Sequence, residues 1–104
     1  MGLVEIRITA PDAEVADVIA RSLVEGRLAA CVQQLPAITS TYHWEGEVER
    51  ATEVLLLAKT TAETFDAVCA KVASLHPYDV PEILAVPVDQ ALTAYLEWVE
   101  DCVD

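Results

Sequence analysis

The stretch from residue 28 to residue 60 constrains the fold more than any other part of the chain. It is rich in Val, Ile, Thr, Tyr, Trp and Leu, and its one strong turn signal is Trp44-Glu45-Gly46-Glu47. This composition predicts two long antiparallel strands that meet near Gly46. The second strand, residues 47–60, would be about 46 Å long, whereas a compact domain of this size is about 35 Å across. The hairpin is therefore expected to extend beyond its own subunit, with Pro36 bending or bulging the first strand.

Both faces of the second strand are apolar. Val54 and Leu56 alternate with Leu55 and Leu57, so the side chains on each face need a cover. A sheet with helices on one side normally carries polar residues on the other side. No spare segment of the chain is evident, so the economical cover is another copy of the chain that pairs with the protruding hairpin.

The remaining segments complete an α+β pattern. In chain order we predict a strand at residues 4–9, a helix capped by Asp12, the hairpin, a helix after the capping box Thr60-x-x-Glu63, a strand at residues 83–88, and a helix capped by Asp89. This order, βαββαβ with a C-terminal helix, is that of a ferredoxin-like antiparallel sheet with two helices on one face. A chain of 104 residues is long enough for one core, so we expect residues 1–104 to form a single domain.

Charge and cysteine content exclude several classes of function. Eighteen Asp and Glu residues against six Lys and Arg give a net charge of −12, which disfavours binding to nucleic acids and to anionic membranes. No apolar run approaches the ~20 residues of a membrane span, and three scattered glycines exclude a glycine-rich phosphate loop. Three widely spaced cysteines without a C-x-x-C motif, and an N-terminus without signal-peptide features, indicate reduced thiols in a cytoplasm.

No set of residues predicts catalysis, so we expect no enzyme. Cys31 lies in an apolar run with no basic neighbour to activate its thiol. Metal binding has more support at His76, which precedes Pro77 in a loop that also contains Asp79 and Glu82. An imidazole beside carboxylates suits Cu²⁺ or another divalent cation, although a His at the end of a helix also serves as a simple cap. No cofactor is expected to be obligatory.

Six short segments, in order along nearly the whole chain, form a specific pattern. They are Thr9-Ala10-Pro11, Leu28-Ala29-Ala30-Cys31-Val32, Ser40-x-Tyr42-x-Trp44-x-Gly46, Leu57-x-Lys59-Thr60, His76-Pro77-Tyr78-x-Val80-Pro81-Glu82 and Tyr95-Leu96-x-Trp98. Together they resemble the CutA family of divalent-cation tolerance proteins. The resemblance implies a cytoplasmic, ferredoxin-like homotrimer that exchanges sheet edges and is associated with tolerance to copper and other divalent cations. Its architecture is similar to that of the P-II signalling trimers, which bind small ligands between subunits.

The resemblance also implies which residues act. Copper-binding members use a Cys just before the Thr-Ala-Pro segment and a His pair at the His-Pro-Tyr segment, where this chain has Ile8 and Leu75-His76. The metal candidates that carry over are His76 and Glu82, and few ligands remain, so modest affinity is expected. The candidates for an inter-subunit cleft are Cys31, Lys59 and Tyr78.

Aromatic residues are the candidates for the trimer interface. Tyr42 and Trp44 lie at the hairpin tip, where exposed rings invite aggregation, and Trp98 gives the last helix a second face to bury.

Three functions stay open. The first is a cation-responsive trimer that binds divalent metal weakly. The second is a P-II-like module that binds a small anionic ligand or a partner protein, with Lys59 supplying the charge, and the third is a structural trimer whose surface contacts a partner.

Overall fold

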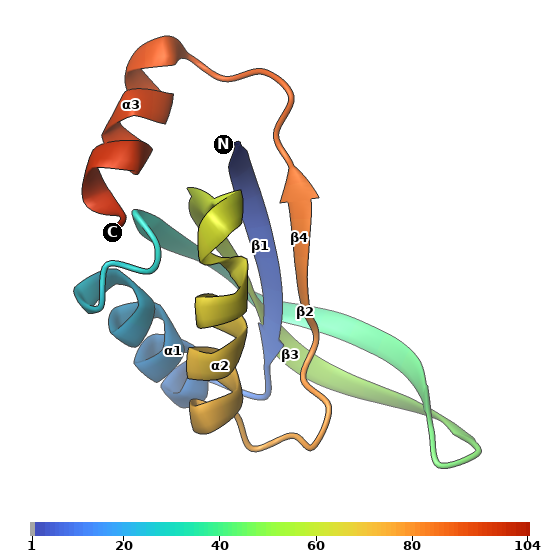
Figure 1. Ribbon diagram of the computed structural model, residues 1–104. Helices are drawn as coiled ribbons and strands as arrows, with labels where there is room; N and C mark the ends of the chain where they lie inside the picture. The colour runs from blue at the N-terminus through green and yellow to red at the C-terminus, as the bar shows by residue number, and fades with distance from the viewer. Residues whose placement is uncertain (1) are drawn as a thin grey trace.

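The computed structural model describes residues 2–104, within which four strands form one antiparallel sheet and three α-helices flank it (Figure 1). The elements are β1 (Leu3–Ala10), α1 (Ala13–Glu25), β2 (Cys31–Trp44), β3 (Glu47–Thr61), α2 (Phe65–Leu75), β4 (Ile83–Pro87) and α3 (Thr93–Cys102). The strand order is β2-β3-β1-β4, and every neighbouring pair is antiparallel. The predicted ferredoxin-like fold with a C-terminal helix is therefore confirmed.

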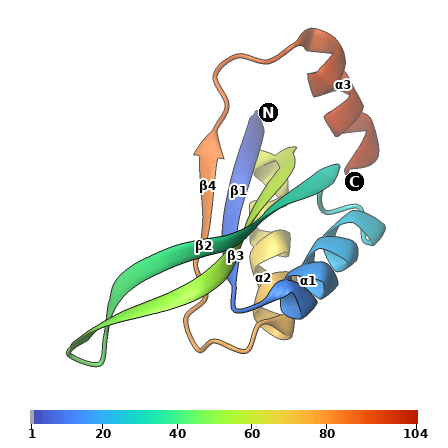
Figure 2. The ribbon, with the colours of Figure 1, turned by 180° about the vertical axis from the view of Figure 1, so that it is seen from behind.

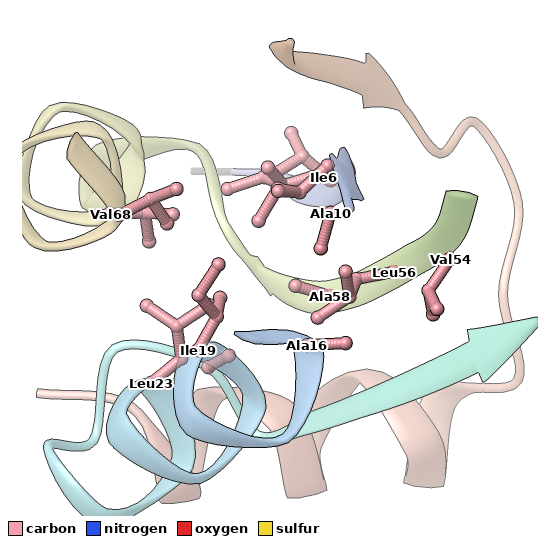
Figure 3. Packing of buried hydrophobic residues seen from close by; sticks show 13 residues of the cluster. Ile6, Ala10, Ala16, Ile19, Leu23, Val54, Leu56, Ala58 and Val68 are labelled. Atoms are coloured by element: carbon pink, nitrogen blue, oxygen red, sulfur yellow. The ribbon is translucent and has the colours of Figure 1, made fainter. Parts of the chain in front are cut away.

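The hydrophobic core lies between one face of the sheet and helices α1 and α2 (Figure 3). From the sheet, Ile6 of β1 and Leu56 of β3 are completely buried, and from the helices so are Ile19, Leu23 and Val68. The strand residues recur with a period of two, and those of α1 recur three or four positions apart, as amphipathic elements require. The sequence periodicity therefore predicts this side of the sheet correctly.

The hairpin of β2 and β3 extends well beyond the helices (Figures 1 and 2). The described residues measure 44 × 25 × 22 Å, which confirms the predicted overhang. At the turn, φ is 49° for Glu45 and 82° for Gly46, the two-residue geometry that matches the twist of paired strands. The register shifts at Pro36 and Ala37, where two residues of β2 interrupt the pairing with β3. This is the bulge predicted from the proline.

The second face of the sheet carries a band of leucines that is only partly covered. Leu35 pairs with Leu55, while Leu57 and Leu84 both pair with Arg7. Leu35 and Leu84 are 43% and 42% exposed. Helix α3 packs elsewhere, in a smaller cluster at the sheet end where β1 and β2 begin, built on Leu3, Ala30 and Val99. This face therefore has an apolar band without a cover of its own, as the alternation in β3 predicts, next to the ion-paired Glu5, Arg7 and Lys59.

Two predicted helix starts are wrong. Strand β3 continues to Thr61 because β1 pairs with it that far, and the Thr60 hydroxyl donates to the carbonyl oxygen of Leu28 (2.7 Å) instead of capping a helix. A short 3₁₀ turn then precedes α2, which has no side-chain cap. Helix α3 begins at Thr93, with Leu92 rather than Asp89 at the capping position. In both places tertiary pairing or loop geometry overrides a local sequence signal.

Candidate functional site: an acidic, aromatic cleft

A cleft of about 780 Å³ lies between the hairpin and the loop that joins α2 to β4. The aromatic side chains that line it are Tyr42, Trp44 and Tyr78, and its carboxylates are Glu49, Glu53, Asp79 and Glu82. No Lys or Arg is found among the described residues that line it. Its size falls in the range of about 300–1,000 Å³ that is typical of small-molecule sites, and its charge suits a cation.

The loop is fixed to the sheet through His76. The backbone N–H of Tyr78 donates to His76 Nδ1 (3.2 Å), and His76 Nε2 lies 2.7 Å from the carbonyl oxygen of Thr9. Because a backbone N–H can only donate, Nδ1 is unprotonated and Nε2 carries the proton that it donates to Thr9. The side chain is buried, and its ring lies 4.6 Å from the ring of Tyr78. His76 thus holds the start of the loop against the end of β1.

A second link joins the loop to the hairpin. Tyr78 Oη donates a hydrogen bond of 2.8 Å to Glu53 Oε2 on β3. Partial burial, and after it the hydrogen bond and charge of Glu53, raise the pKa of Tyr78 to about 12, because both effects favour the neutral phenol. The two links together set the position of the loop across the cleft.

Glu53 is a buried carboxylate without a counter-charge. It is only 7% exposed, yet no ion pair within residues 2–104 includes it. Its Oε1 accepts no hydrogen bond from these residues. Every side-chain oxygen or nitrogen among them that is fully shielded from solvent has a hydrogen-bond partner, so Oε1 is not fully shielded. Oε1 is therefore open to the cleft. Because Oε1 keeps access to water, the carboxylate is tolerated there, and its uncompensated charge attracts positively charged ligands to the cleft.

The predicted metal residues occupy different places around this cleft. Glu82 and Asp79 both line it, and both are exposed. His76 lies outside the lining, with both ring nitrogens in hydrogen bonds. Among residues 2–104, no group of three or more His, Cys, Asp or Glu side chains is arranged to hold a metal ion. Metal binding by His76 and Glu82 stays a prediction.

The three predicted inter-subunit cleft residues do not lie together. Tyr78 lines the cleft, but Cys31 and Lys59 are register partners at the far end of the β2–β3 pair from the turn. Lys59 Nζ donates to Gln33 Oε1 (2.8 Å) and lies 3.5 Å from Glu5 Oε2. The ammonium charge of Lys59 is therefore already compensated within the chain.

The predicted interface residues lie at opposite ends of the molecule (Figures 1 and 2). At the hairpin tip, Tyr42 and Trp44 are 39% and 43% exposed, and on α3 Trp98 is 44% exposed. Trp98 packs against Tyr95, with 5.6 Å between ring centroids. The Tyr95 hydroxyl lies 3.5 Å from Cys31 Sγ, and burial followed by this contact raises the pKa of Tyr95 to about 12. An interface role for the three aromatic residues stays a prediction.

Sequence reasoning missed three contributors to the site, Glu49, Glu53 and Thr9. Glu53 directly precedes the apolar run of β3, and a lone carboxylate next to buried strand residues was a usable signal. Thr9 contributes its carbonyl oxygen to His76, and no side-chain pattern can reveal a backbone contact of this kind.

Two further observations concern the cysteines and the helices. Cys31, Cys69 and Cys102 are all unpaired and partly buried. None of the helices within residues 2–104 is long and apolar enough to cross a membrane.

The fold and the cleft together define a class: a ferredoxin-like α+β protein with an extended hairpin and an acidic, aromatic cleft along that hairpin. The family model described as CutA1 divalent ion tolerance protein matches residues 4–102. The chain therefore belongs to the CutA family, whose members are non-enzymatic tolerance proteins. This confirms the sequence-based resemblance and, at the level of the family, the expectation that the chain is not an enzyme.

Individual relatives agree with this assignment. The chain is 49% identical over 96 residues to the divalent-cation tolerance protein CutA of Thermus thermophilus, which covers 92% of this chain and 93% of that protein. The solved structure of the Thermus thermophilus protein superposes with a TM-score of 0.96 at 46% identity, covering 98% of this chain and 99% of that one. Human protein CutA is 48% identical over 92 residues, or 88% of this chain. The chain spans only 51% of that human protein's length.

Proposed function

We propose that this chain acts as a non-enzymatic homotrimer in tolerance of, or response to, divalent metal ions, copper among them, and that it binds divalent cations weakly. The observation that carries the proposal is family membership over residues 4–102. The acidic cleft supports the proposal, since the hairpin and the loop bring four carboxylates to it, with His43 but no Lys or Arg among the described lining residues.

The geometry of His76 supports it as a metal ligand through Nδ1. Metal-binding histidines usually donate their other ring N–H to a carbonyl or carboxylate, and His76 Nε2 is placed to donate in this way to Thr9. Nδ1 carries the lone pair, which accepts a hydrogen bond of 3.2 Å from the backbone N–H of Tyr78. A metal ion would replace that bond, with Glu82 as the second ligand. Two ligands and a displaced hydrogen bond imply modest affinity.

A copper titration at moderate ionic strength tests this site. We expect His76→Ala and Glu82→Gln each to weaken Cu²⁺ binding several-fold. Glu63→Gln is the matched control, because Glu63 is exposed outside the cleft and its substitution removes the same charge. If all four proteins bind Cu²⁺ alike, diffuse attraction to the −12 charge explains the binding, and the proposed ligands are wrong.

The trimer proposal is supported by the placement of apolar surface. The exposed rings of the hairpin tip and of α3 lie at opposite ends of the subunit. Two different patches favour a head-to-tail contact, which closes into a ring when the rotation fits. The uncovered sheet face around Leu35 and Leu84 would lie inside such a ring. Native mass spectrometry at micromolar concentration should show the trimer, and a predominant monomer of 11.3 kDa would contradict the proposal.

The P-II-like alternative has less support. It needs a basic group for an anionic ligand, and Lys59 is engaged by Gln33 and Glu5. Binding of a small-metabolite panel in place of metal would favour the P-II-like alternative.

We also propose a cytoplasmic location, since three unpaired thiols suit a reducing compartment.

A further inference from the structure

We propose that the acidic, aromatic cleft binds a small organic cation of the alkylammonium class, with an aliphatic polyamine as the best-fitting form. The inference concerns the same cleft as the proposed function, but it assigns a different chemical class of ligand. It rests on three properties of the cleft: an unpaired buried charge, aromatic walls and a volume much larger than an ion.

The unpaired charge is that of Glu53. This side chain is more than nine-tenths buried, one of its oxygens accepts from Tyr78, and the other is open to the cleft without a partner among residues 2–104. Glu49, Asp79 and Glu82 add three further carboxylates at different points of the lining. A ligand with several amino groups along a chain can pair with several of these separated carboxylates at the same time, whereas a single ion cannot.

The aromatic walls favour an organic cation over a metal ion. Tyr42 and Trp44 from the hairpin and Tyr78 from the loop line the same cleft as the carboxylates. An ammonium group attached to methylene groups gains from the faces of such rings and buries its apolar stem against them. A divalent ion gains instead from close sets of oxygen or nitrogen ligands, and residues 2–104 hold no group of three such side chains arranged for one.

The volume points the same way. A cleft of about 780 Å³ has the size of a small-molecule site and leaves most of its space empty around one ion. Two hydrogen bonds, from His76 to Thr9 and from Tyr78 to Glu53, hold its loop wall in place, so the site is largely formed before a ligand enters. Preorganisation of this kind lowers the cost of binding.

Calorimetric titration of the assembled protein with spermidine tests the inference. Spermidine and hexaamminecobalt(III) are both trivalent near neutral pH, but only spermidine has methylene groups. We expect one spermidine per chain, bound about three- to tenfold more tightly than the cobalt complex. Glu53→Gln, whose amide oxygen can still accept from Tyr78, should weaken spermidine binding about tenfold or more. Glu82→Gln, at a more exposed position of the lining, should weaken it less, and the control Glu63→Gln should leave it unchanged.

A direct signal comes from Trp44. In a Trp98→Phe background, used after native mass spectrometry shows that it assembles like wild type, Trp44 is the remaining tryptophan. Its fluorescence should change on titration with spermidine at the same midpoint as the heat. Equal affinity for spermidine and the cobalt complex, or equal losses in Glu53→Gln and Glu63→Gln, would overturn the inference by showing diffuse attraction only. The copper titration is a separate readout. Copper binding that depends on His76 together with absent spermidine binding overturns this inference alone, whereas the reverse result overturns the proposed metal site alone.

Discussion

Replacing Tyr78 with Phe should destabilise the protein although it removes only one oxygen atom. That oxygen donates to Glu53 Oε2 at 2.8 Å, and the carboxylate is 7% exposed with no other partner among residues 2–104. A hydrogen bond to a charged group contributes about 1.5–3 kcal/mol, and a buried acceptor left unpaired loses the full amount. We therefore expect the free energy of unfolding to fall by about 2 kcal/mol.

A double-mutant cycle attributes this loss to the pair. Urea unfolding of wild type, Tyr78→Phe, Glu53→Ala and the double variant should be followed at one protein concentration, because an oligomer's stability depends on concentration. In the Glu53→Ala background the Tyr78→Phe change should cost almost nothing, since the phenol, 37% exposed, then finds water. The expected coupling energy is about 2 kcal/mol.

Tyr95→Phe is the matched control. Its hydroxyl also has a partner, but that partner is the thiol of Cys31 at 3.5 Å, a weak and uncharged one. The cost should stay below about 1 kcal/mol. If Tyr78→Phe costs no more than Tyr95→Phe, or costs the same with and without Glu53, the bond does not hold the loop to the hairpin and the cleft lacks the fixed wall described above.

Three further outcomes are expected. Trp44→Ala should weaken assembly by about 3–5 kcal/mol, the usual cost of losing a large buried aromatic, and an unchanged trimer dissociation constant in sedimentation would contradict an interface role. Tyr78 and Tyr95, with pKa values raised to about 12, should ionise later than free tyrosine at about 10 in an ultraviolet titration. The stability that the neutral hydroxyls of Tyr78 and Tyr95 add should be present below about pH 10 and be lost as the pH rises through about 12. Ionisation of both Tyr78 and Tyr95 at about pH 10 would refute this. Leu56→Ala, at a completely buried position, should cost about 2–5 kcal/mol in urea unfolding, and a cost below about 1 kcal/mol would place it outside the core.

Much of the fold was predictable because the informative signals were periodic. Alternation in β1 and β3 marks the residues that face the helices, and the turn at Glu45 and Gly46 places its glycine at a position of positive φ. The bulge followed from Pro36, which cannot donate to a strand ladder. The errors fell at helix starts, where one side chain has several competing partners. The Thr60 hydroxyl bonds across the chain to Leu28, and nothing local distinguishes that bond from a cap.

The site was less predictable because it depends on contacts between distant segments. In one loop, His76 and Glu82 were identified from their residue types and Tyr78 from the family resemblance. The partners of His76 and Tyr78, Thr9 and Glu53, lie 67 and 25 residues away from them. Residues that match a family pattern can also have separate roles. Lys59 matches such a pattern, yet it sits with its own ion-pair and hydrogen-bond partners at the other end of the sheet from Tyr78.

The hairpin takes part both in the proposed cleft and in the proposed contact between subunits. Its tip carries Tyr42 and Trp44, which line the cleft and are also the proposed contacts with a neighbouring subunit. A residue that serves both purposes couples them, because a ligand that fixes these rings changes the free energy of subunit contact by the amount that assembly changes the ligand's affinity. The bulge at Pro36 and Ala37 lies between this outer segment and the part of the sheet that packs on the helices. If the proposed cation binding holds, a change in the outer segment can therefore leave the core packing unchanged, because the bulge separates the two parts of the hairpin.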